Sequence, residues 1–253
     1  MKSHNPTAQE LGQLETLFPD DAVAARARAD AAGAFQAVNG FWNAVYSGPH
    51  LTPRMKELVL LALHASSSAL NADAIRRHAQ RALVAGASKD DVFDVLVTII
   101  PLANHPLYTG IPVLLDELQK AGRAQDAEIP PMSPAVQSIR EDFIQRRGYW
   151  TAMRDTIGRL MPTYFAAFIN ACMEPWRSGS LSPAERELLY IAIDCSISHT
   201  YEPGMRMHIQ NALRYGATRD QILEVFQLAA LLGIEGYLLG AVAIDADPRA
   251  PAR

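Results

Sequence analysis

The chain has 253 residues, of which 49% are hydrophobic and 20% charged, so it can bury a substantial core as one large domain or two of ordinary size. Its formal charge of −4 and the lack of a lysine or arginine cluster argue against nucleic acid as a partner. The polar N-terminus and the absence of an 18-residue apolar stretch, the longest apolar segment being Val95–Ala103, predict no secretory signal, no membrane partner and a cytoplasmic location.

Taken in chain order, the first half predicts a series of α-helices whose starts are marked by capping residues and whose ends are marked by glycine. They cover about 21–47, a segment opened by Thr52-Pro53, a segment from Asn71 to Gly86, and 89–103 after Ser88. The polar, proline-rich stretch 121–135 is predicted to be a linker.

The second half predicts the same plan, with helices at about 150–177, 183–198, 202–215 and from Thr218 onward. Two capping boxes support the starts, Ser182 with Glu185 and Thr218 with Gln221. Gly216 is a candidate for a left-handed helix end, and 245–253 is predicted to be a frayed tail. No segment alternates with period two, so strands are not expected and the predicted fold class is all-α.

The two halves are copies of one another, offset by 130 residues. Between Leu51 and Leu114, 18 of 64 positions are identical to the residue 130 further on, where chance would give only a handful. We therefore predict a first helical module at 1–120, the linker at 121–135, and a second module at 136–253.

Each copy carries a glutamate followed 21 residues later by a histidine: Glu57 with His78, and Glu187 with His208. Two antiparallel helices joined by a short loop can bring these side chains together, and a carboxylate beside an imidazole forms a proton-transfer pair. The alternatives are structural: a helix dipole favours glutamate near its N-terminus, many histidines fill cores, and common ancestry preserves both.

The copies differ between residues 198 and 208, where the second is far more polar. His199 and Glu202 correspond to alanines in the first copy and Tyr201 to Asn71, whereas Arg206 is matched by an arginine, so the second copy is the better candidate site, although a solvated polar loop is the alternative. Arg206 could hold a substrate carboxylate if it reaches the same cavity, and is otherwise a surface charge.

Three further features bear on the candidate site. His105 occupies the position that Glu235 holds in the second copy. The spacing of His199, Glu202 and His208 matches no defined metal geometry, so no metal is predicted. The two cysteines, Cys172 and Cys195, form no CxxC motif, and we interpret them as core residues.

The pattern L-[TS]-P-x-x-[KR]-E-L, followed by a histidine helix and A-L-x-x-G-A-[ST]-x-D, occurs at 51–95 and again at 181–225. It resembles the carboxymuconolactone decarboxylase / alkyl hydroperoxidase D family. The resemblance implies two tandem helical modules forming an internal pseudodimer, and a homo-oligomer (trimer or hexamer). The peroxidase branch uses C-x-x-C-x-x-x-H, but Tyr201 and Gly204 occupy the cysteine positions before His208, and Asn71 and Ala74 those before His78. A thiol peroxidase is therefore not expected.

The resemblance then implies a cofactor-independent lyase acting on a small carboxylated, aromatic-derived substrate. In this interpretation His208 is the general acid, Glu187 or Glu202 its partner, and His199 or Arg206 the carboxylate anchor. Tyr201, His105, His78 and Glu57 are further candidates for substrate binding. Two alternatives remain open: a non-catalytic helical oligomer that binds a small molecule or acts as a scaffold, and a hydrolase or isomerase of related rings.

Overall fold

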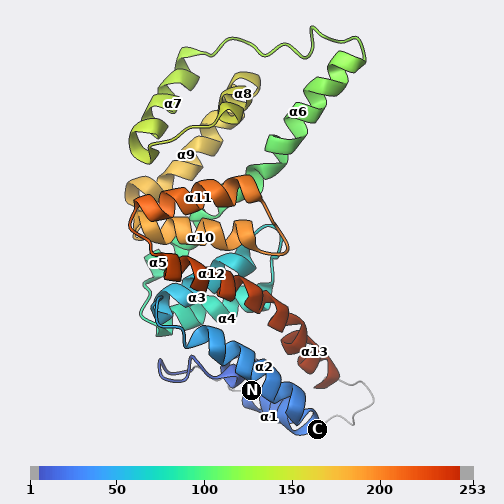
Figure 1. Ribbon diagram of the computed structural model, residues 1–253, viewed down its shortest axis with the longest axis vertical. Helices are drawn as coiled ribbons and strands as arrows, with labels where there is room; N and C mark the ends of the chain where they lie inside the picture. The colour runs from blue at the N-terminus through green and yellow to red at the C-terminus, as the bar shows by residue number, and fades with distance from the viewer. Residues whose placement is uncertain (1–5, 246–253) are drawn as a thin grey trace. The chain divides into compact units, whose positions relative to one another are not determined.

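The computed structural model describes residues 6–245, so the predicted tail lies outside the described part apart from Asp245. Within these residues every regular element is a helix and none is a strand, which confirms the all-α prediction (Figure 1). The α-helices are α1 (Asp21–Asp30), α2 (Ala32–Tyr46), α3 (Pro53–Ala65), α4 (Ala72–Val84), α5 (Lys89–Thr98), α6 (His105–Lys120), α7 (Pro134–Arg147), α8 (Ala152–Leu160), α9 (Pro162–Ser178), α10 (Pro183–Cys195), α11 (Glu202–Arg214), α12 (Arg219–Ala230) and α13 (Glu235–Asp245). Short 3₁₀ segments are η1 (Leu14–Leu17), η2 (Ile100–Asn104) and η3 (Leu231–Ile234).

The predicted helix starts and ends are mostly confirmed. Both capping boxes form, with Ser182 and Glu185 bonding reciprocally at the start of α10 and Thr218 and Gln221 doing so at the start of α12. Gly216 has a φ of +92°, the left-handed conformation that glycine adopts without a Cβ penalty.

Four predicted helices are shorter than expected, and the one predicted over 183–198 ends at Cys195. The stretches 21–47 and 150–177 each break into two helices, at Ala31 (φ −143°, ψ 58°) and at Met161 (φ −136°, ψ 63°). Met161 precedes a proline, which disfavours the helical region for the residue before it. The helix predicted over 89–103 ends at Thr98, because Pro101 has no amide hydrogen to bond the carbonyl four residues earlier.

The repeat extends to details of the backbone. Ala31 and Met161 are 130 residues apart and share the same unusual dihedral angles. Leu70 and Thr200, also 130 apart, are the two described non-glycine residues with positive φ, at 44° and 40°. Both lie in the loop between a glutamate-bearing helix and the following histidine-bearing helix, so the two copies share a strained connection at the same place.

The chain forms two compact units, and these are not the two copies of the repeat. Unit 1 consists of Met1–Val95 and Ser182–Arg253, and unit 2 of Leu96–Leu181. The module boundaries at 1–120 and 136–253 follow the repeat in the sequence rather than compactness, and they stay a prediction.

Unit 1 is built around α3 and α10, the equivalent helices of the two copies, which pack against one another (Figure 1). Their apolar side chains, such as Leu61 and Ile191, are fully buried. The contacts are reciprocal, as in a two-fold dimer. Lys56 of the first copy pairs with Glu224 of the second at 2.9 Å, and their counterparts exchange roles in a 2.5 Å pair between Arg186 and Asp94. This is an internal pseudodimer.

Unit 2 has its own core, formed where α7, α8 and α9 meet the start of α6. Buried side chains there come from all four helices: Ile111, Val136, Phe143, Ile157, Phe165, Ile169 and Met173. Gly158 is needed for close packing of α8, because a Cβ at this position would lie 2.7 Å from Val136 and 3.0 Å from the Phe165 ring.

One segment corrects the prediction that the chain has no long apolar stretch. Residues Arg219–Ile244 form a continuous helical segment that contains an 18-residue window of mean hydropathy 1.7, and a third of that window is buried inside the protein. The search for unbroken apolar runs missed it because isolated polar residues such as Gln227 interrupt it. A single segment of this kind is weak evidence for a membrane span, since core helices pass the same test.

Candidate active site

The first copy brings Glu57 and His78 together inside unit 1. Glu57 projects from α3 and His78 from α4, and Nδ1 of the imidazole lies 2.8 Å from the carboxylate Oε2. Both side chains are inaccessible, with 0% and 1% of their surface exposed. The buried pair is therefore a defined hydrogen bond between adjacent helices.

Glu57 is also held by a charged partner. Its Oε1 accepts hydrogen bonds from Arg81 Nε at 3.0 Å and Nη2 at 2.7 Å, and from the Tyr46 hydroxyl at 2.7 Å. Burial opposes ionisation of Glu57, but the Arg81 guanidinium and the bond from His78 outweigh it and bring its pKa to about 2. At neutral pH this carboxylate is ionised and forms an ion pair with Arg81.

A second group of polar side chains adjoins His78. The His64 and His78 rings stack with centroids 5.1 Å apart. His64 Nε2 lies 3.4 Å from Glu235, a carboxylate contributed by the second copy, which also pairs with Arg77 and accepts from Asn71 at 3.1 Å. Burial lowers the pKa of His64 to about 2 and that of His78 to about 4, so both imidazoles are neutral at pH 7.

This group is where a metal ion could be considered. Ligand atoms of His64, His78 and Glu235 all lie within 4.8 Å of one another. However, Arg77 already occupies the Glu235 carboxylate, and its positive charge acts against a cation in the same place. We interpret these residues as a hydrogen-bonded network.

The second copy repeats the pair with different neighbours. His208 Nδ1, on α11, lies 2.6 Å from Oε2 of Glu187 on α10, and both side chains are buried. The Tyr190 ring covers the imidazole, with centroids 4.6 Å apart. Asn211 occupies the position of Arg81, and Asp194 that of His64. A carboxylate thus replaces an imidazole beside the pair.

Asp194 places a second carboxylate next to His208. Its Oδ2 lies 3.9 Å from His208 Nε2 and its Oδ1 lies 3.6 Å from His199 Nε2. Gly204 makes room for it, since a Cβ there would collide with Asp194 Oδ2 and with the Tyr201 ring. Burial, reinforced by the negative charge of Glu187, raises the pKa of Asp194 to about 8. This acid can hold its proton at neutral pH.

The raised pKa predicts a pH-dependent effect of Asp194→Asn on stability. A group whose folded pKa lies above its unfolded value contributes stability that is complete below the unfolded pKa and is lost as pH rises through the folded one. For Asp194 this window runs from about 3.8 to about 8. Asparagine keeps the shape without ionising, so the melting temperature of the variant relative to wild type should increase from pH 5 to pH 8.5. A difference that stays constant between these pH values would contradict the assignment.

The remaining predicted residues are spread over different environments. Glu202 and Arg206 pair with one another on the exposed surface of α11, as residues four apart on a helix do, and the structure does not bring them to the buried pair. Tyr201 is half-buried at the start of α11, where its ring packs over Gly204. His199 reaches Asp194, and burial lowers its pKa. His105 begins α6 in unit 2, with its ring 5.9 Å from that of Tyr108.

Sequence reasoning did not identify several residues of the two sites, although the spacing of some of them along a helix could have indicated that they lie beside the glutamates and histidines. His64 and Asp194 follow the two glutamates by seven residues, which places them on the same helix face. Arg81 follows His78 by three residues and so lies one turn along α4. Glu235 gave no such signal, because it reaches the first copy from the other half of the chain.

Neither thiol is suited to nucleophilic or redox chemistry. Cys172 is buried, and burial raises its pKa to about 12. Cys195 is partly buried, and burial together with the charge of Asp194 raises its pKa to about 11. Protonated thiols of this kind are poor nucleophiles.

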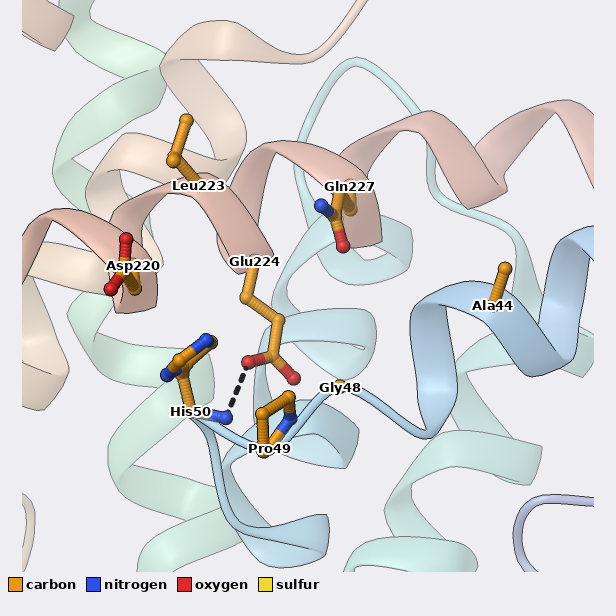
Figure 2. Close-up of a pocket in the computed structure, with 8 residues that line it drawn as sticks. All are labelled: Ala44, Gly48, Pro49, His50, Asp220, Leu223, Glu224 and Gln227. Atoms are coloured by element: carbon orange, nitrogen blue, oxygen red, sulfur yellow. Dashed lines mark hydrogen bonds between the residues drawn. The ribbon is translucent and has the colours of Figure 1, made fainter.

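A separate cavity of about 290 Å³ opens in unit 1 between the end of α2 and the start of α12 (Figure 2). Its buried acid, Glu224, accepts the backbone N–H groups of His50 at 2.8 Å and Leu51 at 3.0 Å, besides pairing with Lys56. Gly48 permits this approach, since a Cβ there would lie 2.6 Å from the carboxylate. Glu224 is therefore held by Lys56 and by two backbone N–H groups, and we assign no ligand to this cavity.

The comparisons with known proteins agree with this architecture. The sequence pattern of the carboxymuconolactone decarboxylase family matches residues 32–108 and 162–243, so the two matches begin at equivalent helices, α2 and α9. No curated protein matches the chain. A crystal structure from Burkholderia xenovorans LB400, described as a "putative gamma-carboxymuconolactone decarboxylase subunit", is similar over 96% of this chain and 98% of its own, with 31% identity and a TM-score of 0.84. The chain is thus a tandem, two-module member of the carboxymuconolactone decarboxylase family that lacks the CxxC pair.

Proposed function

We propose that the protein is a cofactor-independent lyase that decarboxylates a small carboxylated lactone or a related ring, using the second-copy site. The single observation that supports this most is the buried Glu187–His208 hydrogen bond with Asp194 beside it. Decarboxylation of such a substrate leaves a carbanion conjugated with a carbonyl, and an enzyme without a cofactor needs a proton donor there.

The division of roles follows from the neighbours of His208. Glu187 bonds Nδ1 and thereby fixes the orientation of the ring, which leaves Nε2 to exchange a proton. Asp194 faces that nitrogen and, with a pKa of about 8, can carry the proton that is transferred. Tyr190 limits the access of water to the imidazole. In the first copy the equivalent carboxylate, that of Glu57, is paired with Arg81. We propose that the first-copy pair has a structural role.

The proposal is tested by measuring CO₂ release from γ-carboxymuconolactone with wild type and with Glu187→Gln. Wild type should turn the substrate over, and the variant should be at least tenfold slower because His208 loses its orienting carboxylate. Lack of turnover by wild type would remove this substrate, and equal rates for both proteins would remove Glu187 from the mechanism.

Further parts of the proposal concern assembly and location. We propose a homotrimer, in which each chain contributes two modules, and a cytoplasmic location. The protonated thiols described above support a site that works without redox chemistry. Binding of the substrate without turnover would favour the alternative function, a non-catalytic small-molecule-binding oligomer.

A further inference from the structure

The proposed reaction consumes a proton that has to reach a buried site. When the substrate loses CO₂, the electron pair of the broken C–C bond stays on the ring as an enolate, and a C–H bond then forms at that carbon. Each turnover therefore takes up one proton from water. The side chains of Glu187 and Asp194 are 0% exposed and that of His208 is 6% exposed. The proton donor of this site needs a route to solvent.

His199 lies between Asp194 and the surface. The two oxygens of the Asp194 carboxyl face different imidazoles: Oδ2 lies 3.9 Å from Nε2 of His208, and Oδ1 lies 3.6 Å from Nε2 of His199. Unlike Asp194, the His199 side chain is partly exposed, at 13%. Both distances are longer than a hydrogen bond, as contacts that transfer protons often are before the substrate binds. Asp194 thus has one imidazole inside the site and another that reaches water.

The loop between α10 and α11 holds His199 in this place. Asp194 lies in the last turn of α10, and its backbone carbonyl accepts the N–H of Tyr201 at 2.9 Å. The Ser196 carbonyl accepts the N–H of His199 at 3.0 Å and that of Thr200 at 2.9 Å. These bonds fold the loop back onto the end of α10, so the imidazole is kept beside the carboxyl.

Other neighbours of Asp194 are not suited to carrying a proton from water. Glu187 and His208 are themselves buried. The thiol of Cys195 has a pKa raised to about 11 by burial and by the charge of Asp194, so it holds its proton at neutral pH. His199 combines partial exposure with an imidazole, the side chain that exchanges protons most readily near neutral pH.

The acidities of the two groups favour transfer toward Asp194. Burial lowers the pKa of His199, so its protonated form is a stronger acid than a free imidazolium. Burial and the charge of Glu187 raise the pKa of Asp194 to about 8, so its carboxylate is the stronger base of the two. A proton that His199 takes from water therefore passes to Asp194 with a favourable free energy.

The first copy has neither member of this arrangement. Ala69 stands in place of His199, and His64 stands in place of Asp194. Its glutamate, Glu57, is paired with Arg81. The arrangement is therefore a feature of the copy to which we assign the reaction.

We propose that His199 is a relay that returns a proton from water to Asp194, a role that rests on the reaction proposed above. After Asp194 has given up its proton, the Nε2–H bond of His199 breaks and an O–H bond forms at Oδ1 of Asp194. The imidazole then regains a proton from water. His199 acts through Asp194 and does not touch the substrate.

A pH jump tests the relay without any substrate. The full-length protein is brought rapidly from about pH 9.5 to about pH 6.5, across the Asp194 pKa of about 8, in weak buffer. Infrared absorption follows the protonated carboxyl of Asp194, identified as the band that Asp194→Asn lacks. His199→Gln should slow the return of this band at least tenfold, and free imidazole in the buffer should restore the rate. His50→Gln, which changes an exposed histidine, is the matched control and should behave as wild type does.

Turnover in the same variant gives a readout that a structural role would not produce. At pH 7 Asp194 of His199→Gln starts with its proton, so the first turnover should be as fast as in wild type. Release of CO₂ from γ-carboxymuconolactone should then show a burst of one equivalent per site, followed by a steady state at least tenfold slower. Free imidazole should speed up the steady state and leave the burst unchanged.

The possible results separate the relay from the reaction. Reprotonation of Asp194 at the wild-type rate in His199→Gln would overturn the proposal, and so would a first turnover slowed as much as the later ones. Failure of wild type to release CO₂ would remove the proposed reaction instead. The pH jump would then still decide whether His199 carries protons to Asp194.

Discussion

Replacing Glu57 by glutamine should destabilise the protein by about 3–5 kcal/mol, although the two side chains have nearly the same shape. The carboxylate is completely buried, and its Oε1 receives two donors from Arg81 and one from Tyr46. Glutamine would leave the guanidinium of Arg81, which is itself 1% exposed, without its counter-ion in the core of unit 1. For a chain of this size the loss corresponds to a fall in melting temperature of roughly 10 °C.

The double variant Glu57→Gln, Arg81→Met separates the buried charge from the lost hydrogen bonds. If the unpaired guanidinium causes most of the damage, removing it as well should recover a large part of the stability, and the coupling energy of the cycle measures this part. Glu117→Gln makes the same change in an exposed ion pair with Lys120 and should leave the melting temperature unchanged. A single variant at Glu57 that melts like wild type would show that Arg81 does not depend on this carboxylate.

The sequence predicted the parts of the site that depend on one helical hairpin. Glu57 with His78, and Glu187 with His208, meet because a short loop joins adjacent antiparallel helices, and the 21-residue spacing is the same in both copies. The resemblance to the family also implied the pseudodimer, whose reciprocal ion pairs require both copies in one unit.

Other features could not be predicted because they depend on how distant segments pack. Glu235 enters the first-copy site from α13, 171 positions after His64, and no local pattern announces this contact. The polar residues between 198 and 208 identified the site residues only in part. Glu202 and Arg206 face solvent as a pair four residues apart, while Asp194, in the preceding helix, lies beside His208.

The sequence predicted the two copies of the repeat but not the two compact units of the structure. The repeat assigns 96–120 to the first copy and 136–181 to the second, whereas the structure gathers these residues into unit 2. Compactness depends on tertiary contacts, and α7, α8 and α9 bury their apolar faces against one another and against Ile111. Sequence similarity between copies carries no information about such contacts.

Replacing His208 by glutamine is expected to lower kcat/KM for the substrate of the proposed reaction by 10²–10⁴-fold, the usual contribution of a positioned acid or base. Glutamine can still bond Glu187 but cannot carry a proton. The same substitution at His78 should act mainly on stability, because Glu57 is ionised and bound to Arg81, its pKa is held at about 2, and His78 is neutral at pH 7 with a pKa of about 4. The asymmetry follows from two exchanges between the copies, Arg81 for Asn211 and His64 for Asp194.

CO₂ release from γ-carboxymuconolactone, normalised to the folded fraction from circular dichroism, distinguishes the two histidines. His50→Gln changes an exposed histidine outside both sites and serves as the matched control for the substitution itself.

The pH profile adds a readout that a structural role would not change. If Asp194 supplies the proton, kcat of wild type should fall as pH rises through about 8, and Asp194→Asn should lose this fall in kcat. A His78 variant as inactive as the His208 variant while still folded would assign the chemistry to both copies. An active His208 variant would remove the imidazole from the reaction, and the carboxylate pair of Glu187 and Asp194 would remain as the candidate proton donor.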